Sequence, residues 1–175
     1  DLRELKCIIG ACEIADKVFD QLLLEIKPGL TEKYIAARLS FLLRKYGSEK
    51  DSFAPIVASG PNSALPHASP TGRKLKKGDT LMLDFGAVYE GYHSDMTRTV
   101  FVGSCSARQK KIHTMVLAAQ KKALAKLKVG IFCGCVDSAA RGYLDKKGFG
   151  AHFFHSTGHG VGLKVHEYPS LRSSS

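Results

Sequence analysis

The 175-residue sequence predicts an α+β fold made of amphipathic helices and an antiparallel sheet. Apolar residues recur every three or four positions in several long segments, which is typical of helices with one buried face. The stretch 81–100 is apolar and β-prone on both sides of a polar bend, which predicts a β-hairpin. A short internal similarity, of 26–30 to 127–131 and of 36–38 to 139–141, indicates two related halves around a shared sheet.

Two helices are predicted in the first half. The first begins near residue 2 and ends at Pro28–Gly29, because proline and glycine interrupt helices. The second begins after Thr31, a suitable N-cap, and runs to about Tyr46, before Gly47. The apolar spacing in the first helix predicts its buried face: Leu2, Leu5, Ile9, Cys12, Phe19, Leu23 and Ile26.

The remaining elements follow in chain order. A strand is predicted at 53–59, then an irregular loop at 59–70, then the hairpin at 81–100. A fourth helix is predicted at 136–147, and a last strand in the histidine-rich block 152–169. The third helix, between the hairpin and the fourth helix, is predicted from five apolar positions: Ile112, Val116, Ala119, Ala123 and Leu127.

Composition describes an ordinary globular chain. With 44% hydrophobic residues, 1–175 is long enough for one domain with its own core. We find no segment typical of a transmembrane span or signal peptide, so the prediction is a cytoplasmic protein without membrane contact. An odd number of cysteines without a paired spacing fits a reducing compartment: Cys7, Cys12, Cys105, Cys133 and Cys135.

The net charge of +10 raises nucleic acid as a partner, since a basic face is the electrostatic footprint of such proteins. The basic residues are spread out, with local runs at 73–77, 108–111 and 121–128. The last two runs flank a predicted helix and fit its solvated face. We therefore disfavour nucleic acid, and a salt-dependence test would separate that alternative.

Two aspartates indicate a metal site in the hairpin. If its loop is centred between Tyr89 and Glu90, Asp84 lies directly opposite Asp95 on one face. Like charges across an antiparallel pair repel, so this arrangement favours a cation between them. The alternative is that each Asp is a turn residue or pairs with the nearby Arg98. A register different by one residue would place the carboxylates on opposite faces.

Histidines supply further candidate ligands. The block 152–169 holds four of them, His152, His155, His159 and His166, interleaved with glycines that allow close backbone approach. Imidazole and carboxylate together suit Zn, Mn, Co or Fe. His67 lies in the irregular loop 59–70, where catalytic groups often collect, although by itself it is a weak signal.

Three segments together carry a resemblance to a known family: PIVASGPNSALPHA, LDFGAVYEGYHSDMTRT and STGHGVGLKVHEYP. In this order they resemble the catalytic domain of the Xaa-Pro aminopeptidase and prolidase metallopeptidases. These belong to the pita-bread superfamily, with methionine aminopeptidase and creatinase. The resemblance implies Asp84, Asp95 and His159 as metal ligands. It implies substrate-binding and proton-handling roles for His67, His155 and His166.

The implied reaction is hydrolysis of the bond between an N-terminal residue and proline. A divalent ion, with Mn²⁺ favoured over Co²⁺ or Zn²⁺, would lower the pKa of a water and polarise the scissile carbonyl. Family members bind two ions with two further Glu ligands, which match nothing in this chain. We therefore expect an incomplete catalytic domain that holds at most one ion and has little or no activity alone.

An alternative is a non-catalytic pita-bread module that binds peptides or proteins. The partner predicted for the enzyme is a peptide with proline in second position. Because the family's later strands would complete the sheet, we also expect exposed sheet edges and association with further copies of the chain.

Overall fold

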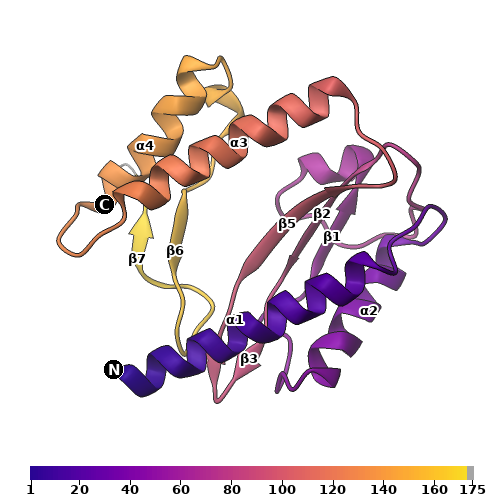
Figure 1. The fold of residues 1–175 in the computed structure, drawn as a ribbon, viewed down its shortest axis with the longest axis horizontal. Helices are drawn as coiled ribbons and strands as arrows, with labels where there is room; N and C mark the ends of the chain where they lie inside the picture. The colour runs from indigo at the N-terminus through magenta and orange to yellow at the C-terminus, as the bar shows by residue number, and fades with distance from the viewer. Residues whose placement is uncertain (173–175) are drawn as a thin grey trace. The chain divides into compact units, whose positions relative to one another are not determined.

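The structure, a computed structural model, describes residues 1–172 and divides the chain into two compact units (Figure 1). The first unit comprises Asp1–Ser106 together with Val161–Val165. The second comprises Ala107–Gly160 and the residues from His166 onward. The chain therefore passes between the units three times, and each unit is described by itself.

The first unit contains two helices and a three-stranded antiparallel sheet of order β1-β2-β5, with β2 in the middle (Figure 1). A short hairpin, β3–β4, joins β2 to β5. The elements are α1 (Leu2–Leu23), α2 (Glu32–Lys45), β1 (Ile56–Ser59), the 3-10 helix η1 (Gly60–Ala64), β2 (Thr80–Phe85), β3 (Val88–Tyr89), β4 (Tyr92–His93) and β5 (Met96–Phe101).

The second unit pairs two helices with a small two-stranded antiparallel sheet. Its elements are α3 (Ala107–Lys126), α4 (Cys133–Lys146), the 3-10 helix η2 (Gly150–His152), β6 (Gly158–Gly160) and β7 (Glu167–Leu171). Its core lies mainly between α3 and α4 and contains Met115, Ala119, Ala123, Val136, Ala140 and Leu144. Each unit thus has the order helix, helix, strand, as the internal similarity predicts.

Side chains of the central strand β2 alternate between the two faces of the first sheet. Leu81, Leu83 and Phe85 are fully buried and belong to the core shared with α1 and α2. Asp84 alternates with them and therefore points to the opposite face. Alternation along β2 thus turns Asp84 away from the apolar core.

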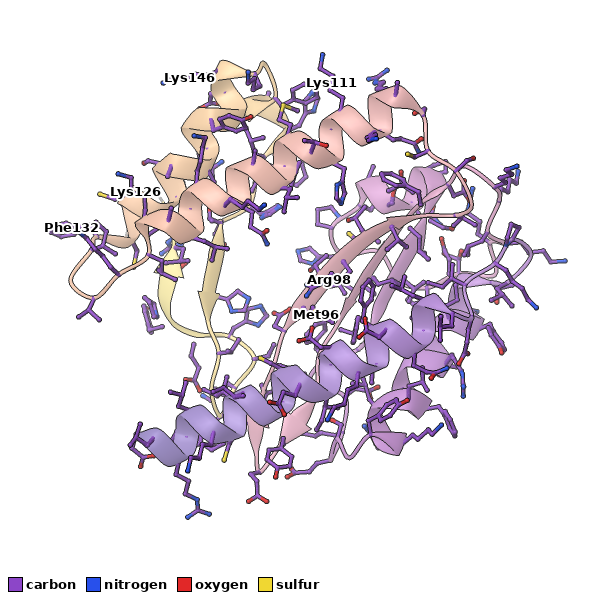
Figure 2. All side chains as sticks on the ribbon, viewed as in Figure 1. Met96, Arg98, Lys111, Lys126, Phe132 and Lys146 are labelled. Carbon is purple, nitrogen blue, oxygen red and sulfur yellow. The ribbon has the colours of Figure 1, made fainter. Side chains whose placement is uncertain are left out.

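On β5, Met96 and Arg98 occupy the helix side of the sheet (Figure 2). Met96 joins the core, and the Arg98 guanidinium lies 3.6 Å from the Asp16 carboxylate on α1 and above the Phe19 ring. Arg98 therefore forms an ion pair on the helix face of the sheet, with Asp16, and not the salt bridge with Asp84 considered above.

The predicted buried face of α1 is wrong. Cys7, Ala11, Ile14, Ala15, Val18 and Leu22 form the buried side of this helix. Cys12 is exposed, and Leu2, Leu5, Ile9 and Leu23 are 79%, 51%, 47% and 40% exposed, while Phe19 and Ile26 pack partly against the core. The helix carries two apolar stripes of similar spacing, and the stripe with small alanines packs inward. The helix also ends at Leu23, before the proline.

Other boundaries agree more closely. α2 begins after the N-cap Thr31, whose hydroxyl accepts from the Tyr34 amide, and ends before Tyr46, as predicted. β1 begins at Ile56, three residues later than predicted, after Pro55, which has no N–H for a ladder. α3 buries Ala119 and Ala123.

Two other features of the second unit differ from prediction. Val116 and Leu127 of the third helix face are 51% and 53% exposed. The histidine-rich block forms η2 and two short strands, where one strand was predicted. All five cysteines are free thiols in the structure. Within residues 1–172, every helix is too short or too polar to span a bilayer.

Candidate metal centre

The hairpin register differs by two residues from the prediction. Asp84 pairs with Thr97, and Phe85 pairs with Met96. The bend lies at Glu90 and Gly91, which both have positive φ, at 52° and 78°, as two-residue hairpin turns require. The predicted pairing of Asp84 with Asp95 is therefore wrong. Because side chains alternate with period two, a shift of two keeps both aspartates on the same face.

The two aspartates still interact. Burial, followed by the charge of Asp95, raises the pKa of Asp84 from 3.8 to about 6. A hydrogen bond from Thr97 and the nearby charge of His67 act in the opposite direction. Thr97 is a contributor that the sequence analysis missed, although it lies inside the SDMTRT segment. Asp84 is thus an acid in a site that disfavours its charged form.

One carboxylate oxygen of Asp84, Oδ1, is buried without a hydrogen-bond donor among the residues that the structure describes. A buried carboxylate oxygen without a donor costs free energy, and a bound cation removes that cost. The carboxylates of Asp84 and Asp95 repel each other, and both are suitable ligands for a divalent metal ion.

Backbone packing fixes the chain beside Asp95. A Cβ on Gly86 would lie 1.9 Å from the Ser94 carbonyl oxygen, so only glycine fits there. The Ser94 amide donates to the Ala87 carbonyl at 2.9 Å, and the Ser94 hydroxyl donates to the Ala11 carbonyl on α1 at 3.1 Å. These contacts hold the strand immediately before the second aspartate.

His67 lies in the exposed loop that follows η1. Its charge affects Asp84, so this predicted residue belongs to the same electrostatic environment in the first unit. Within residues 60–70 the Leu65 amide donates to the Asn62 carbonyl, the Ala68 amide to the Leu65 carbonyl, and the Ser63 hydroxyl to the Gly60 carbonyl. The position of this loop depends on how its two ends are held.

In the second unit, His159 and His166 come together across the β6–β7 hairpin. Their ring centroids are 4.2 Å apart. Nδ1 of His159 lies 2.9 Å from the Gly160 carbonyl oxygen, which can only accept, so the proton lies on Nδ1. In that tautomer Nε2 carries the lone pair that a metal needs. Glycine is required at 160, since a Cβ would meet the Tyr168 carbonyl oxygen at 2.4 Å.

His155 is exposed, and its ring packs edge-on against Phe153 with centroids 4.9 Å apart. A buried ion pair holds this segment. The Asp137 carboxylate is fully buried and accepts from Arg141 Nε at 2.8 Å and from the Thr157 hydroxyl at 2.7 Å. Arg141 also donates to the carbonyls of Phe153 and His155. The segment that leads into β6 is therefore tied to α4.

The structure thus groups the predicted residues within each unit. Asp84, Asp95 and His67 share an environment in the first unit, and His159 and His166 stack in the second. His152, one of the four clustered histidines, lies in η2 with its ring 6.0 Å from that of Phe149.

The sequence of almost the whole chain matches a known protein family. The model of Metallopeptidase family M24 matches residues 6–175. The chain belongs to this family. Membership implies a divalent metal, and the pita-bread fold and the resemblance to the Xaa-Pro aminopeptidase and prolidase family are confirmed.

Relatives are similar along almost the whole chain. The Xaa-Pro dipeptidase of Pyrococcus horikoshii is 46% identical over 169 residues, which cover 97% of this chain and 48% of that protein. The X-Pro aminopeptidase of Thermotoga maritima superimposes with a TM-score of 0.97 at 43% identity, covering 99% of this chain and 49% of that structure. The prolidase of Pyrococcus furiosus superimposes with a TM-score of 0.95 at 42% identity, covering 98% of this chain and 51% of that structure. The chain spans about half the length of the relatives that it matches.

Proposed function

We propose that the protein to which this chain belongs is a metal-dependent exopeptidase for substrates with proline in second position. It would release the N-terminal residue before proline or split an Xaa-Pro dipeptide. The observation that carries the proposal is the buried, unpartnered Asp84 Oδ1 beside Asp95, a local arrangement that favours a bound cation. The names of the relatives, Xaa-Pro dipeptidase and X-Pro aminopeptidase, supply the substrate class.

Asp84, Asp95 and His159 are the proposed metal ligands. Carboxylate with imidazole suits several transition ions, and Mn²⁺ is the ion that we favour. When bound, such an ion supplies polarisation of the scissile carbonyl and a water of lowered pKa. His159 contributes through Nε2, since its Nδ1 donates to the Gly160 carbonyl.

The remaining histidines would act on the substrate. We assign His166 to donate a hydrogen bond to the oxygen that gains negative charge during hydrolysis, because such donors stabilise the transition state. His67 would contact the substrate from its exposed loop. For His155 we propose a role in substrate binding or proton handling. Five free thiols support a reducing compartment, which we take to be the cytoplasm.

Calorimetric titration of this chain with Mn²⁺ tests the ligands. We expect binding with a stoichiometry near one, and none in the double variant Asp84→Ala, Asp95→Ala. The matched control, Glu13→Ala with Asp20→Ala, removes two exposed carboxylates from α1 and should bind as the unaltered chain does. Equal binding by both double variants would contradict the ligand assignment.

Hydrolysis tests the reaction itself. The chain with Mn²⁺ is incubated with an Xaa-Pro dipeptide and with the same dipeptide carrying alanine in place of proline. Release of the free amino acid from the proline substrate alone supports the proposal. Metal binding without hydrolysis of either peptide would agree with the expected low activity of this chain alone. Binding of the peptides without any metal binding would favour the alternative, a peptide-binding module.

A further inference from the structure

The carboxylate of Glu32, at the first position of α2, is buried completely although it belongs to a charged residue. Burying a carboxylate is costly unless hydrogen bonds replace the lost water. No step of the proposed reaction uses this residue, and the sequence analysis did not identify it. Its surroundings show what it holds.

The Glu32 side chain accepts hydrogen bonds from the segment 59–71, which contains His67. Oε1 accepts from the Ser59 amide at 2.8 Å and from the Ser59 hydroxyl at 2.7 Å. Oε2 accepts from the Thr71 amide at 3.0 Å and from the Thr71 hydroxyl at 2.6 Å. The Asn62 amide group donates to both oxygens, at 3.1 and 3.2 Å.

One carboxylate therefore joins the two ends of the loop. Ser59 is the last residue of β1, so that end is fixed to the sheet that carries Asp84. Thr71 lies four residues after His67, at the other end. Between them the loop surface is open: Leu65 is 58% exposed and His67 is exposed.

A second group of contacts, around Arg73, holds the Ser59 end of the loop. Arg73 donates to the Ser59 hydroxyl at 2.6 Å and forms a two-pronged ion pair with Asp79. The Ser59 hydroxyl thus accepts from Arg73 and donates to Glu32. This chain of contacts fixes the β1 end. Thr71, at the other end, donates to Glu32 through its amide and its hydroxyl. The Arg73 amide donates to the Thr71 hydroxyl at 3.1 Å, and the Lys33 amide donates to the Thr71 carbonyl at 3.0 Å.

We propose that Glu32 is a positioning residue, which sets the place of His67 relative to Asp84 by holding both ends of the loop 60–70. The proposal rests on the proposed function for the role of His67. Without the carboxylate, the bond from the Lys33 amide to the Thr71 carbonyl would still hold the backbone of that end to α2, but the bonds to the Thr71 amide and hydroxyl and to Asn62 would be lost. The loop between the ends would loosen, and His67 could move. Displacement of a catalytic or substrate-contacting group by about 1 Å can cost up to roughly 100-fold in rate.

Amide hydrogen exchange of the metal-free chain tests the clamp without any activity. In Glu32→Gln, the amide nitrogen of glutamine would face N–H donors. We expect exchange at Leu65 and Ala68 to become roughly tenfold faster, which corresponds to about 1.4 kcal/mol. At exchange times too short for global unfolding, β2 and β5 should stay protected in both proteins. Leu39→Ala, a fully buried core change on the same helix, should loosen the core without selectively freeing the loop.

If Glu32→Gln fails to fold, Thr71→Val removes one hydroxyl donor and keeps the backbone bond to Glu32. It should also speed amide exchange in the loop and not in the sheet, by a smaller factor than Glu32→Gln does. Unchanged exchange in the loop, or an equal rise in loop and sheet, would overturn the proposal.

The second readout is a double-mutant cycle on kcat/KM for an Xaa-Pro dipeptide. Glu32→Gln should lower kcat/KM about tenfold in the unaltered background and less than about twofold beside His67→Ala, since a residue acting through His67 loses its effect with it. Equal losses in both backgrounds would show a merely structural role. If the chain hydrolyses nothing, as the missing Glu ligands lead us to expect, the exchange result alone decides the clamp. The proposed function is then tested separately by metal binding.

Discussion

Two acidic side chains of the first unit, Glu32 and Asp84, meet opposite conditions. Glu32 is fully buried, and its pKa lies below the ordinary value because hydrogen bonds from Thr71 and Ser59 outweigh the opposing effect of burial. Asp84 has a buried oxygen without a donor, and burial with the charge of Asp95 raises its pKa to about 6. The fold satisfies the first carboxylate and, among the described residues, leaves one oxygen of the second without a partner. The cation of the proposed function would supply that partner.

Asp137 in the second unit is a third case. It is also fully buried, but its pKa is lowered chiefly by hydrogen bonding to the Arg141 guanidinium, with Thr157 as a further donor. Glu32 relies on several uncharged donors and Asp137 on a cationic side chain of its own helix. Asp84 has one uncharged donor, Thr97, and its Oδ1 has no partner among the described residues. The comparison separates carboxylates that stabilise the fold from one that serves binding.

The largest expected effect breaks the Asp137 ion pair. Arg141→Met leaves the buried carboxylate without its cation, which typically costs about 3–5 kcal/mol of unfolding free energy. Urea denaturation at pH 7 measures it. Lys146→Met, an exposed change on the same helix, should cost little. A loss below about 1 kcal/mol for Arg141→Met would show that Thr157 alone satisfies Asp137.

Glu32→Gln should have the next largest effect. It keeps the shape of the side chain but turns an NH₂ group toward N–H donors, and each buried donor left unpaired costs about 1–3 kcal/mol. We expect a loss of about 2–3 kcal/mol in the same urea experiment. Glu25→Gln on the surface, which removes only the partly exposed pair with Arg38, is the control and should lose less than about 1 kcal/mol. A loss no greater than that of the control would remove the contrast with Asp84.

Asp84→Asn should change stability in the other direction. In metal-free protein at pH 7 it removes the repulsion of Asp95, and like charges on neighbouring strands cost about 0.2–1 kcal/mol. A thermal melt with a chelator should therefore show a small rise in Tm. With Mn²⁺ in place of chelator the order should reverse, because only the unaltered chain gains from the ion. A lower Tm in chelator would indicate that Asp84 is structural.

The smallest effect is in the pH dependence. Stability from the lowered pKa of Glu32 is fully present above its ordinary value of 4.5 and is lost as pH falls through the folded pKa. The deficit of Glu32→Gln should therefore shrink below about pH 4.5.

Asp84 has the opposite sign, because its raised pKa favours the folded state when it is protonated. The gain of Asp84→Asn in metal-free protein should grow as pH rises from 3.8 to about 6. Unfolding free energies between pH 3 and 7, with a chelator present, measure both. Parallel profiles for the two variants would contradict the comparison.

Local patterns predicted much of the fold because helix caps and strand alternation act over a few residues. Thr31 and Gly47 bounded α2 correctly, and the hairpin was found from its β-prone flanks. The face of α1 was not predicted, since two apolar stripes of equal spacing compete. Packing of Ala11 and Ala15 against the rest of the core, which spacing does not encode, selects one of them.

The sequence alone determined the family, the α+β class and the candidate residues Asp84, Asp95, His67, His155, His159 and His166, since these depend on residue type and order. Tertiary structure decided the register of Asp84 against Thr97, because turn geometry and pairing along the whole hairpin fix it together. It also decided that Glu32 is buried under donors from residues 59, 62 and 71. Those contacts join residues far apart in the sequence, which short-range patterns do not predict. Because the carboxylate is buried, each lost hydrogen bond costs free energy.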